Sequence, residues 1–185
     1  MTRLRVSDGI ELRLLGKDDA AALFTLVDDN RAHLRRWLPW VDGTESTNDS
    51  MAFIEAVRAQ FAKDGTMQSG VYYDGALVGM CGLLPISSVN NSVLLGYWLA
   101  EHRSGEGIIT ASAKRLVSYA FSDLGVNKVS ITAAVDNHKS RAIPERLAFT
   151  LEGVERAAAK VNGAYHDHVH YSVLRSEWMC ADVGA

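Results

Sequence analysis

The feature that most constrains this sequence is an apolar strand that leads through a glycine turn into an amphipathic helix. Residues 93–99 form a continuous apolar run of strand length, which suits a strand buried on both faces. Gly105 and Gly107 follow this run, and Gly125 later supplies a C′ residue that ends the helix. Between them the apolar residues recur at the spacing of one helix face, at positions 109, 113, 116, 117, 120, 121 and 124. The centre of the chain is therefore predicted to run strand, glycine turn, helix.

A strand, a glycine turn and a helix in this order favour the binding of an anion. The first backbone N–H groups of a helix have no intrahelical partner, and the helix dipole makes this end positive. Glycine lets a phosphate approach the backbone closely. The same pattern also occurs as a plain structural connection, so both interpretations stay open. A dinucleotide-binding loop would carry a third glycine where Thr110 stands, and this difference argues against a nicotinamide cofactor.

Length and composition indicate one globular domain over residues 1–185, because 185 residues with 48% hydrophobic side chains suffice for one well-filled core. The net charge of −3 gives no general attraction to nucleic acids or anionic membranes, so neither is expected as a partner. We find no apolar stretch of transmembrane length and no signal peptide, and therefore expect a cytoplasmic protein. Cys81 and Cys180 lack metal-ligand spacing, which favours buried, reduced thiols and no metal site.

The rest of the chain alternates strand-like and helix-like segments without a repeat or a linker. Alternating apolar and charged residues predict a first strand at 10–14, and a helix begins at Asp18 and Asp19. Hairpin turns are predicted at Asp74-Gly75 and Asn162-Gly163. Further helices are expected at residues 48–63 and 137–147, and further strands at residues 66–73, 76–84, 128–135, 149–160 and 165–174.

An aromatic segment follows the first predicted helix. Trp37 and Trp40 flank Pro39, which stops any helix at this point. Two tryptophans beside a proline either line a binding groove or form a hydrophobic plug beneath the first helices. The residues alone leave both interpretations open.

Several of these segments together resemble the GNAT acetyltransferase superfamily, and within it the Rim-type branch of ribosomal-protein N-terminal acetyltransferases. The resemblance covers nearly the whole chain and rests on several motifs in the right order. These are Gly96-Tyr97-Trp98-Leu99, residues 105–110, Asn137-His138-Lys139-Ser140, residues 144–149, Leu151-Glu152-Gly153, Arg13, Asp19, residues 34–40 and Tyr165-His166-Asp167. It implies an α/β (α+β) fold with a mixed, mostly antiparallel, seven-stranded sheet that is splayed between its fourth and fifth strands and flanked by about four helices.

The resemblance also implies acetyl-coenzyme A as the co-substrate. The pantetheine arm would bind to the backbone of the fourth strand, at Tyr97, Trp98 and Leu99. The pyrophosphate would bind to the backbone of the glycine turn, at Gly105, Glu106, Gly107, Ile108, Ile109 and Thr110, which agrees with the anion site inferred above. The chain departs from the usual motif of the superfamily at Ser104 and at Ile109, where a bulky side chain replaces a small one.

Asn137 and Ser140 match the Asn-x-x-Ser pattern of the Rim-type branch. In that branch the serine is thought to stabilise or protonate the departing thiolate, and the asparagine holds the coenzyme arm, so both residues are candidate catalytic and coenzyme-binding residues. Asn137 is also a good helix N-cap, and Ser140 suits the first helical turn that follows it. Pro144 lacks an N–H group, which leaves the Ser140 carbonyl free for another partner.

The general base cannot be assigned from the sequence. Leu94 and Ala159 occupy positions where some relatives carry an acid. The remaining candidates are Asp167, His166, His168, His33 and Glu101. An acceptor groove is expected around Trp37, Trp40 and Asp167, which are therefore candidate substrate-binding residues.

Three functions remain open. The branch resemblance favours acetylation of the N-terminal α-amine of a protein such as a ribosomal protein. The alternatives are acetylation of a small amine, such as a polyamine, an antibiotic or a metabolite, and binding of an acyl-coenzyme A without catalysis. Dimers are common among relatives, so a homodimer is a further open expectation.

Overall fold

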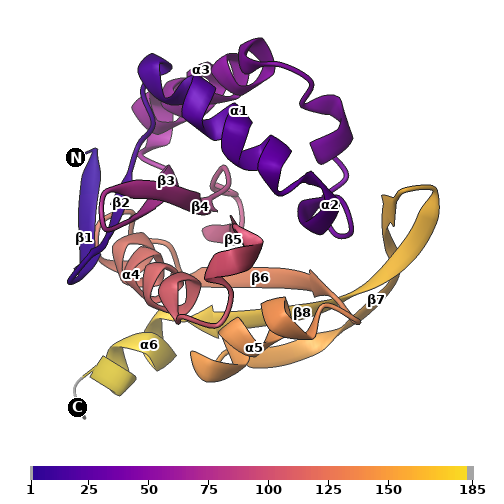
Figure 1. The fold of residues 1–185 in the computed structure, drawn as a ribbon. Coiled ribbons are helices and arrows are strands. Elements are labelled where there is room, and N and C mark those ends of the chain that lie inside the picture. The colour runs from indigo at the N-terminus through magenta and orange to yellow at the C-terminus, as the bar shows by residue number, and fades with distance from the viewer. Residues whose placement is uncertain (1, 183–185) are drawn as a thin grey trace.

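The computed structural model describes the backbone of residues 2–182 and the side chains of residues 2–178. Within these residues the strands form one eight-stranded sheet in the order β1-β2-β3-β4-β5-β6-β8-β7 (Figure 1). β5 and β6 run parallel and the other neighbours run antiparallel, which confirms the predicted mixed, mostly antiparallel sheet. The strands are β1 (Arg3–Ser7), β2 (Ile10–Arg13), β3 (Gln68–Tyr73), β4 (Ala76–Leu83), β5 (Ser92–Leu99), β6 (Lys128–Ala134), β7 (Thr150–Val161) and β8 (Ala164–Leu174).

Helices lie on both faces of this sheet. Figure 1 shows α1 and α3 on one face, and α4, α5 and α6 on the side opposite to them. The helices in the described residues are α1 (Ala20–Asp29), α2 (Arg31–Leu34), α3 (Thr47–Asp64), α4 (Ile108–Ser122), α5 (His138–Arg146) and α6 (Arg175–Asp182). The sheet therefore separates an α1/α3 side from an α4/α5 side.

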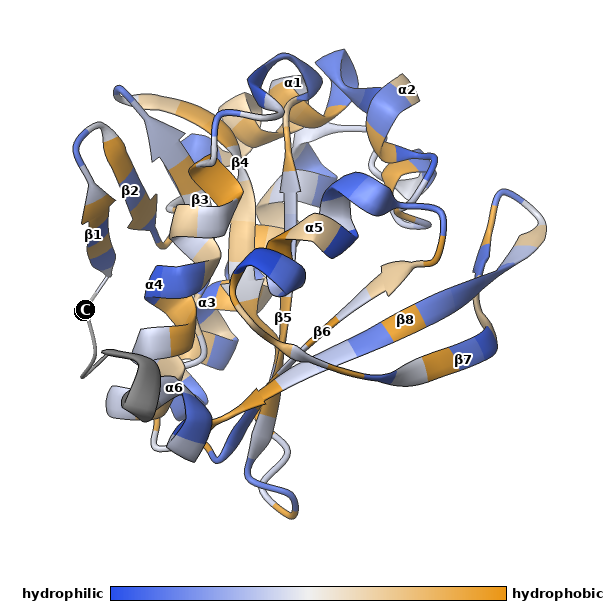
Figure 2. Ribbon diagram, turned by 90° about the horizontal axis from the view of Figure 1, so that it is seen from below, coloured by the Kyte–Doolittle hydropathy of each residue, from blue (hydrophilic) through white to orange (hydrophobic). Residues whose placement is uncertain are grey.

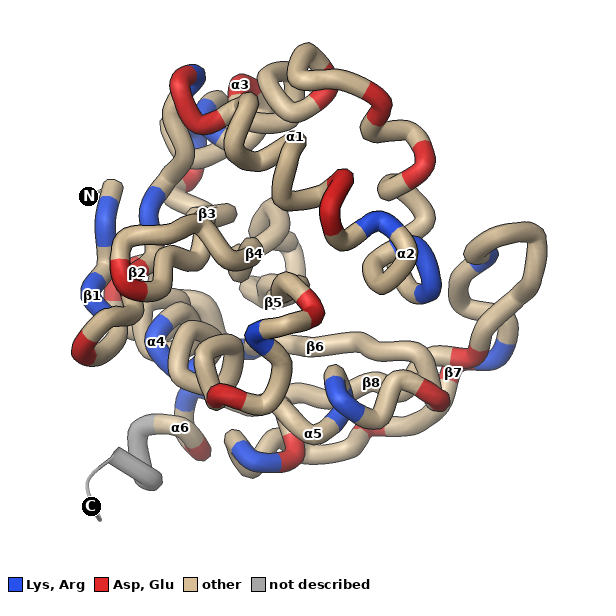
Figure 3. The backbone as a smooth tube through the Cα atoms, in the orientation of Figure 1, with Lys and Arg blue, Asp and Glu red and all other residues tan. Residues whose placement is uncertain are grey.

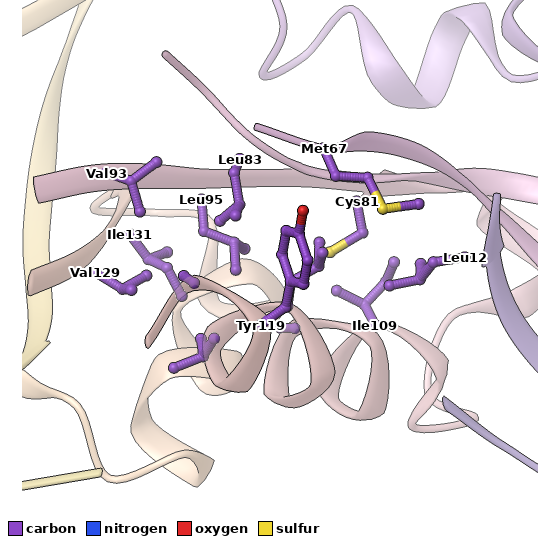
Figure 4. Close-up of a cluster of buried hydrophobic side chains, with 14 of the residues drawn as sticks. Leu12, Met67, Cys81, Leu83, Val93, Leu95, Ile109, Tyr119, Val129 and Ile131 are labelled. Atoms are coloured by element: carbon purple, nitrogen blue, oxygen red, sulfur yellow. The ribbon is translucent and has the colours of Figure 1, made fainter. Parts of the chain in front are cut away.

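The larger hydrophobic core lies between the sheet and α4. Tyr119 of α4 points toward the sheet, and Ile109 of α4 lies beside Leu12 of β2 (Figure 4). Cys81 of β4 belongs to this core, where it is fully buried and free of a disulfide, as predicted. The side chain of Cys180 lies outside the described residues. A second core joins α1 and α3 to the opposite face of β3, β4 and β5.

The N-terminus accounts for the eighth strand of the described sheet. The predicted first strand at 10–14 is present as β2, and residues 3–7 form an additional strand that pairs with it. Gly9, with φ of +74°, supplies the left-handed residue between the two strands. Because of this extra strand, the predicted fourth and fifth strands are β5 and β6. The helices α2 and α6 were also not predicted: α2 is a single turn, which is too short to show a helical period.

The last two strands form a long hairpin that turns at Asn162 and Gly163, both in left-handed conformations, as the Asn-Gly pair predicted. This hairpin is largely hydrophilic and curves toward α2 (Figures 1 and 2). At its tip the Asn162 side-chain amide donates a hydrogen bond of 2.8 Å to the Arg35 carbonyl. The hairpin is thus attached to the segment that follows α2. Across the part of the chain that the structure describes, no helix is long and apolar enough to span a membrane.

Candidate active site

The site is built around a splay between β5 and β6. These strands pair in parallel at only three positions, from Ser92–Lys128 to Leu94–Ser130. On its other side β5 stays paired with β4 as far as Leu99. We define the splay as the space where residues 95–99 of β5 and residues 131–134 of β6 are no longer paired. This confirms the position of the splay that the resemblance implied.

The alternation of hydrogen bonds decides which amides of β5 face the splay. The Leu84 amide donates to the Leu94 carbonyl, and the Ala100 amide donates to the Val78 carbonyl, so even-numbered residues of β5 direct their backbone toward β4. The odd-numbered residues of β5 therefore direct their backbone toward the splay, and these residues are Leu95, Tyr97 and Leu99. The backbone of Trp98 points toward β4, so its predicted backbone contact with a pantetheine arm does not fit this register.

The glycine turn lies at the N-terminus of α4. Gly105 has φ of +93° and Gly107 has φ of +76°, conformations that side chains disfavour, and Gly107 is the N-cap of α4. The next N–H groups, those of Ile108, Ile109 and Thr110, begin the helix and have no acceptor in a preceding turn. An added Cβ at either glycine would meet no described atom within 4 Å, so the turn stays open to a ligand.

Ile109 does not obstruct this turn. Its side chain is buried in the core between α4 and the sheet, so the bulky residue at this motif position points away from the anion site. Arg103 and Glu106 form an ion pair of 3.6 Å beside the turn. Basic and acidic residues are interspersed around α4 and α5 (Figure 3). An anion at this turn would therefore be bound by the backbone amides and the helix dipole.

Ser140 is held beside β5 by Tyr97. The Tyr97 hydroxyl donates a hydrogen bond of 2.9 Å to the Ser140 carbonyl and accepts one of 3.3 Å from the Ser140 hydroxyl. Pro144 cannot donate to that carbonyl, because proline has no N–H group, and the Tyr97 hydroxyl donates in its place. Burial raises the pKa of the Tyr97 phenol, so the phenol stays protonated near neutral pH.

Asn137 caps α5, because its side-chain oxygen accepts a hydrogen bond of 3.2 Å from the Ser140 amide. The structure therefore brings Asn137, Ser140 and Tyr97 together at the start of α5. The cap interpretation of Asn137 is confirmed by this contact, and its contact with a coenzyme stays a prediction. The cap and the Tyr97 bridge together fix the first turn of α5.

The opposite side of the sheet carries the aromatic residues predicted to bind the acceptor. Trp40 is 41% exposed, and its ring lies 6.1 Å from the ring of Trp98, centroid to centroid. Trp98 packs against the α1/α3 core, so this pair lies on the side away from Tyr97. Trp37 is half-buried in the same segment. Trp40 is therefore exposed next to the end of β5.

The segment that carries these tryptophans is tied down by two residues that the sequence did not single out. Asn30, at the end of α1, accepts a hydrogen bond of 2.9 Å from the Glu101 amide just after β5. Arg31 donates hydrogen bonds of 2.6 and 2.7 Å to the carbonyls of Val41 and Thr44. In the sequence these two residues stand out only as polar residues near a helix end. That pattern does not reveal which distant groups they bind.

The acidic residues considered as a general base make other contacts in the structure. Asp167 accepts a hydrogen bond of 2.8 Å from the Ala157 amide, at a bulge in β7, so it stabilises the hairpin. Its role in acceptor binding stays a prediction. Glu101 is exposed and lies 3.7 Å from His33. Ala159 pairs with His166 across the hairpin. The described residues hold no group of three or more metal-ligating side chains.

These features fit acetyl-coenzyme A. Amides of β5 that face the splay can bond to the amides of a pantetheine arm, and the open glycine turn can bind a pyrophosphate. Ser140 lies on the same side of the sheet as α4, next to the strand that such an arm would follow.

The chain is similar in sequence and in fold to known acetyltransferases. Residues 10–150 match the family model described as Acetyltransferase (GNAT) domain. The chain is 41% identical, over 96% of its length and 98% of the relative, to the putative ribosomal N-acetyltransferase YdaF of Bacillus subtilis. Its fold matches a structure of the ribosomal L7/L12 α-N-protein acetyltransferase RimL with coenzyme A, at a TM-score of 0.89 and 27% identity, covering 93% of this chain and 97% of that one.

A third match is the microcin C7 self-immunity acetyltransferase MccE in complex with acetyl-CoA and AMP. The TM-score is 0.88 and the identity 28%, with 94% of this chain and 96% of that chain covered. The family match covers well over half of the sequence, and the identity to YdaF extends over nearly all of it. The chain therefore belongs to the GNAT acetyltransferase family and is an N-acetyltransferase that uses acetyl-coenzyme A.

Proposed function

We propose that the acceptor is the N-terminal α-amine of a protein, with a ribosomal protein as the leading candidate, met in the cytoplasm. The observation that carries this proposal is the likeness to YdaF and RimL, whose names assign them to ribosomal substrates. The absence of an acid at Leu94 and Ala159 is a second argument. With a pKa near 7.7–8.0, roughly one α-amine in six to ten is neutral at pH 7, against about one lysine in a few thousand.

The proposed mechanism begins with a neutral α-amine that enters from the side of Trp40 and attacks the thioester carbonyl in the splay. The amides that point into the splay, such as those of Leu95 and Tyr97, stabilise the oxyanion as it forms. When the carbon–sulfur bond breaks, Ser140 donates a proton to the thiolate, and its hydroxyl is positioned for this by Tyr97. The amine loses one proton, which passes to solvent, as the amide forms, and Ser140 regains a proton from solvent.

A small amine is the second candidate acceptor. The likeness to MccE, whose structure contains AMP, favours it, because that enzyme is named for immunity to a microcin. The GNAT family assignment argues against the third alternative, a non-catalytic acyl-coenzyme A-binding protein.

The test is an acetylation assay with peptides that carry a free or a blocked N-terminus. The proposal expects that a peptide with a free α-amine is acetylated there, and that blocking the α-amine abolishes product even when a lysine is present. Acetylation of the lysine alone, or of polyamines alone, would contradict it.

A further inference from the structure

Residues on both sides of the splay lie at the level of Trp98. The last β5–β6 pair, Leu94–Ser130, lies four residues before Trp98 on β5. Extending this parallel register by four residues places Ala134 of β6 across the splay from Trp98. Ala134 pairs with His168 of β8, and His168 pairs with Glu155 of β7. A histidine therefore lies across the splay from Trp98, one strand beyond Ala134.

These side chains share one face of the sheet. Leu94 and Ser130 are paired, and Trp98 and Ala134 follow them by four residues on their strands, which keeps the face the same. Ala134, His168 and Glu155 are directly paired, and paired residues project to the same side. Trp98 belongs to the α1/α3 side and packs against Trp40. Tyr97, one residue earlier, projects to the other face, where it binds Ser140. An amine that attacks a thioester held near Ser140 from the opposite face therefore passes between Trp98 and the Ala134–His168 edge.

His168 is within reach of that path. It is one strand away from the edge of the splay, and neighbouring strands lie about 4.8 Å apart. Its partner on β6 is Ala134, whose small side chain leaves the imidazole a route toward the splay. An imidazole at this position would reach an amine in the splay directly or through one water molecule.

The chemical state of His168 suits a proton acceptor. Burial lowers its pKa below the ordinary value, His170 and His166 on the same strand lower it further, and Glu155 of β7 raises it in part. The neutral form of the ring is therefore favoured. The ring of His170 is already engaged by a contact of 2.8 Å with the Glu155 carboxylate. Among the described side chains, no carboxylate lies within ion-pair distance of His168.

We infer that His168 is a catalytic residue that accepts the proton lost by the attacking amine, directly or through one water molecule. The amine nitrogen forms a bond to the carbonyl carbon, the carbon–sulfur bond breaks, and the thiolate takes the proton of Ser140. The proton of the amine passes to His168 and then to solvent, and Ser140 regains a proton from solvent. The sum is one amide and one free thiol.

The test compares His168→Gln with the matched variants His170→Gln and His166→Gln on the same strand. We expect His168→Gln to lower kcat at pH 7 by roughly 10²-fold. In the wild type, kcat/KM falls with acid for two reasons, protonation of the acceptor amine and protonation of His168. The variant should keep the first decrease and lose the second, which is the acidic limb due to His168. The dissociation constant of acetyl-coenzyme A, measured by calorimetry, should stay within threefold. His170→Gln should retain the limb and most of the activity.

Chemical rescue separates proton transfer from a structural role. Added imidazole should restore part of the activity of His168→Ala and should leave His170→Ala unchanged. The inference is overturned if His168→Gln keeps kcat within threefold together with the acidic limb, if imidazole does not rescue His168→Ala, or if the loss appears in His166→Gln instead.

The inference rests on acetyl transfer and not on the identity of the acceptor. The assay therefore uses whichever amine the wild type acetylates fastest in a panel of N-terminal peptides and polyamines. A preference for polyamines would contradict the proposed function while still testing His168. If every amine of the panel is inert, slow hydrolysis of acetyl-coenzyme A gives the comparison, because the attacking water also loses a proton.

Discussion

The hydroxyl of Tyr97 lies 2.9 Å from the Ser140 carbonyl oxygen and 3.3 Å from the Ser140 hydroxyl oxygen, so one phenol holds both the backbone and the side chain of the serine. Pro144 makes this arrangement necessary, because it leaves the Ser140 carbonyl without its helical donor. The contact joins β5 at the splay to the first turn of α5. It positions the Ser140 hydroxyl beside the strand whose amides face the splay.

Ser140→Ala tests the proposed proton donor. We expect kcat to fall by roughly 10²-fold, while the dissociation constant of acetyl-coenzyme A changes by less than about threefold, because the hydroxyl acts on the leaving thiolate. Steady-state kinetics and calorimetry measure the two quantities. Unchanged turnover would remove Ser140 from the mechanism.

Tyr97→Phe, combined with Ser140→Ala in a double-mutant cycle, tests whether Tyr97 acts through Ser140. Alone it should lower kcat by roughly tenfold, because the Ser140 hydroxyl loses its partner, and it should lower stability by about 1–3 kcal/mol, because a part-buried carbonyl loses its donor. In the Ser140→Ala background the effect of Tyr97→Phe on kcat should disappear. Additive effects on kcat would show that Tyr97 acts independently of Ser140.

Gly107→Ala tests the anion site at the start of α4. An added Cβ has room there, so the expected effect comes from the left-handed backbone at φ +76°. Strain of about 1–2 kcal/mol should shift the turn and weaken coenzyme A binding by roughly tenfold. Gly43→Ala is the control, because an added Cβ there meets no described atom within 4 Å and φ is not positive. Equal affinities for both variants would argue against the turn as the pyrophosphate site.

The sequence predicted the strand, the glycine turn and α4 better than it predicted the contacts around the tryptophan segment. The strand, the glycine turn and α4 form one continuous segment, and periodicity together with glycine positions encodes it locally. That the Ser140 carbonyl is free for another partner could be anticipated because Pro144 removes an N–H, but Tyr97 as that partner could not. The contacts of Asn30 and Asn162 could not, because each joins residues far apart in the chain. Asp167 was predicted to bind substrate, and no local pattern reveals its contact with the bulge of β7.

Asn162→Gly tests the attachment of the β7–β8 hairpin. Glycine keeps the left-handed turn at φ +50° and removes the amide that binds the Arg35 carbonyl. The hairpin tip should then move more freely beside the Trp40 segment, and KM for the acceptor should rise by roughly threefold or more with little change in coenzyme A affinity. Asn91→Gly is the matched control, since Asn91 also has a positive φ but contacts Gly125. An equal rise in both variants would contradict this role.

Glu11→Gln tests the pH dependence of the N-terminal hairpin. Hydrogen bonds from Arg13 and Arg3 lower the pKa of Glu11 to about 2. A lowered pKa contributes stability above the ordinary value near 4.5, and this contribution is lost as the pH falls toward about 2. The variant should therefore be less stable than the wild type at pH 7, and denaturant midpoints should converge as the pH decreases to 3.

Asp8→Asn is the control on the same hairpin, because its ion pair with Arg5 is fully exposed. We expect its midpoint to follow that of the wild type at both pH values. A difference for Glu11→Gln that stays constant between pH 7 and pH 3 would exclude Glu11 as the group that titrates.

The most direct test of the proposed function is the release of coenzyme A thiol from acetyl-coenzyme A across N-terminal peptides, polyamines and aminoglycosides, with mass spectrometry of each product. The account predicts turnover on peptides with a free N-terminus and an acetyl group on the α-amine. Turnover confined to polyamines or aminoglycosides would contradict the protein N-terminus as acceptor. Tight binding of acetyl-coenzyme A without turnover on any amine would contradict catalysis on these acceptor classes altogether.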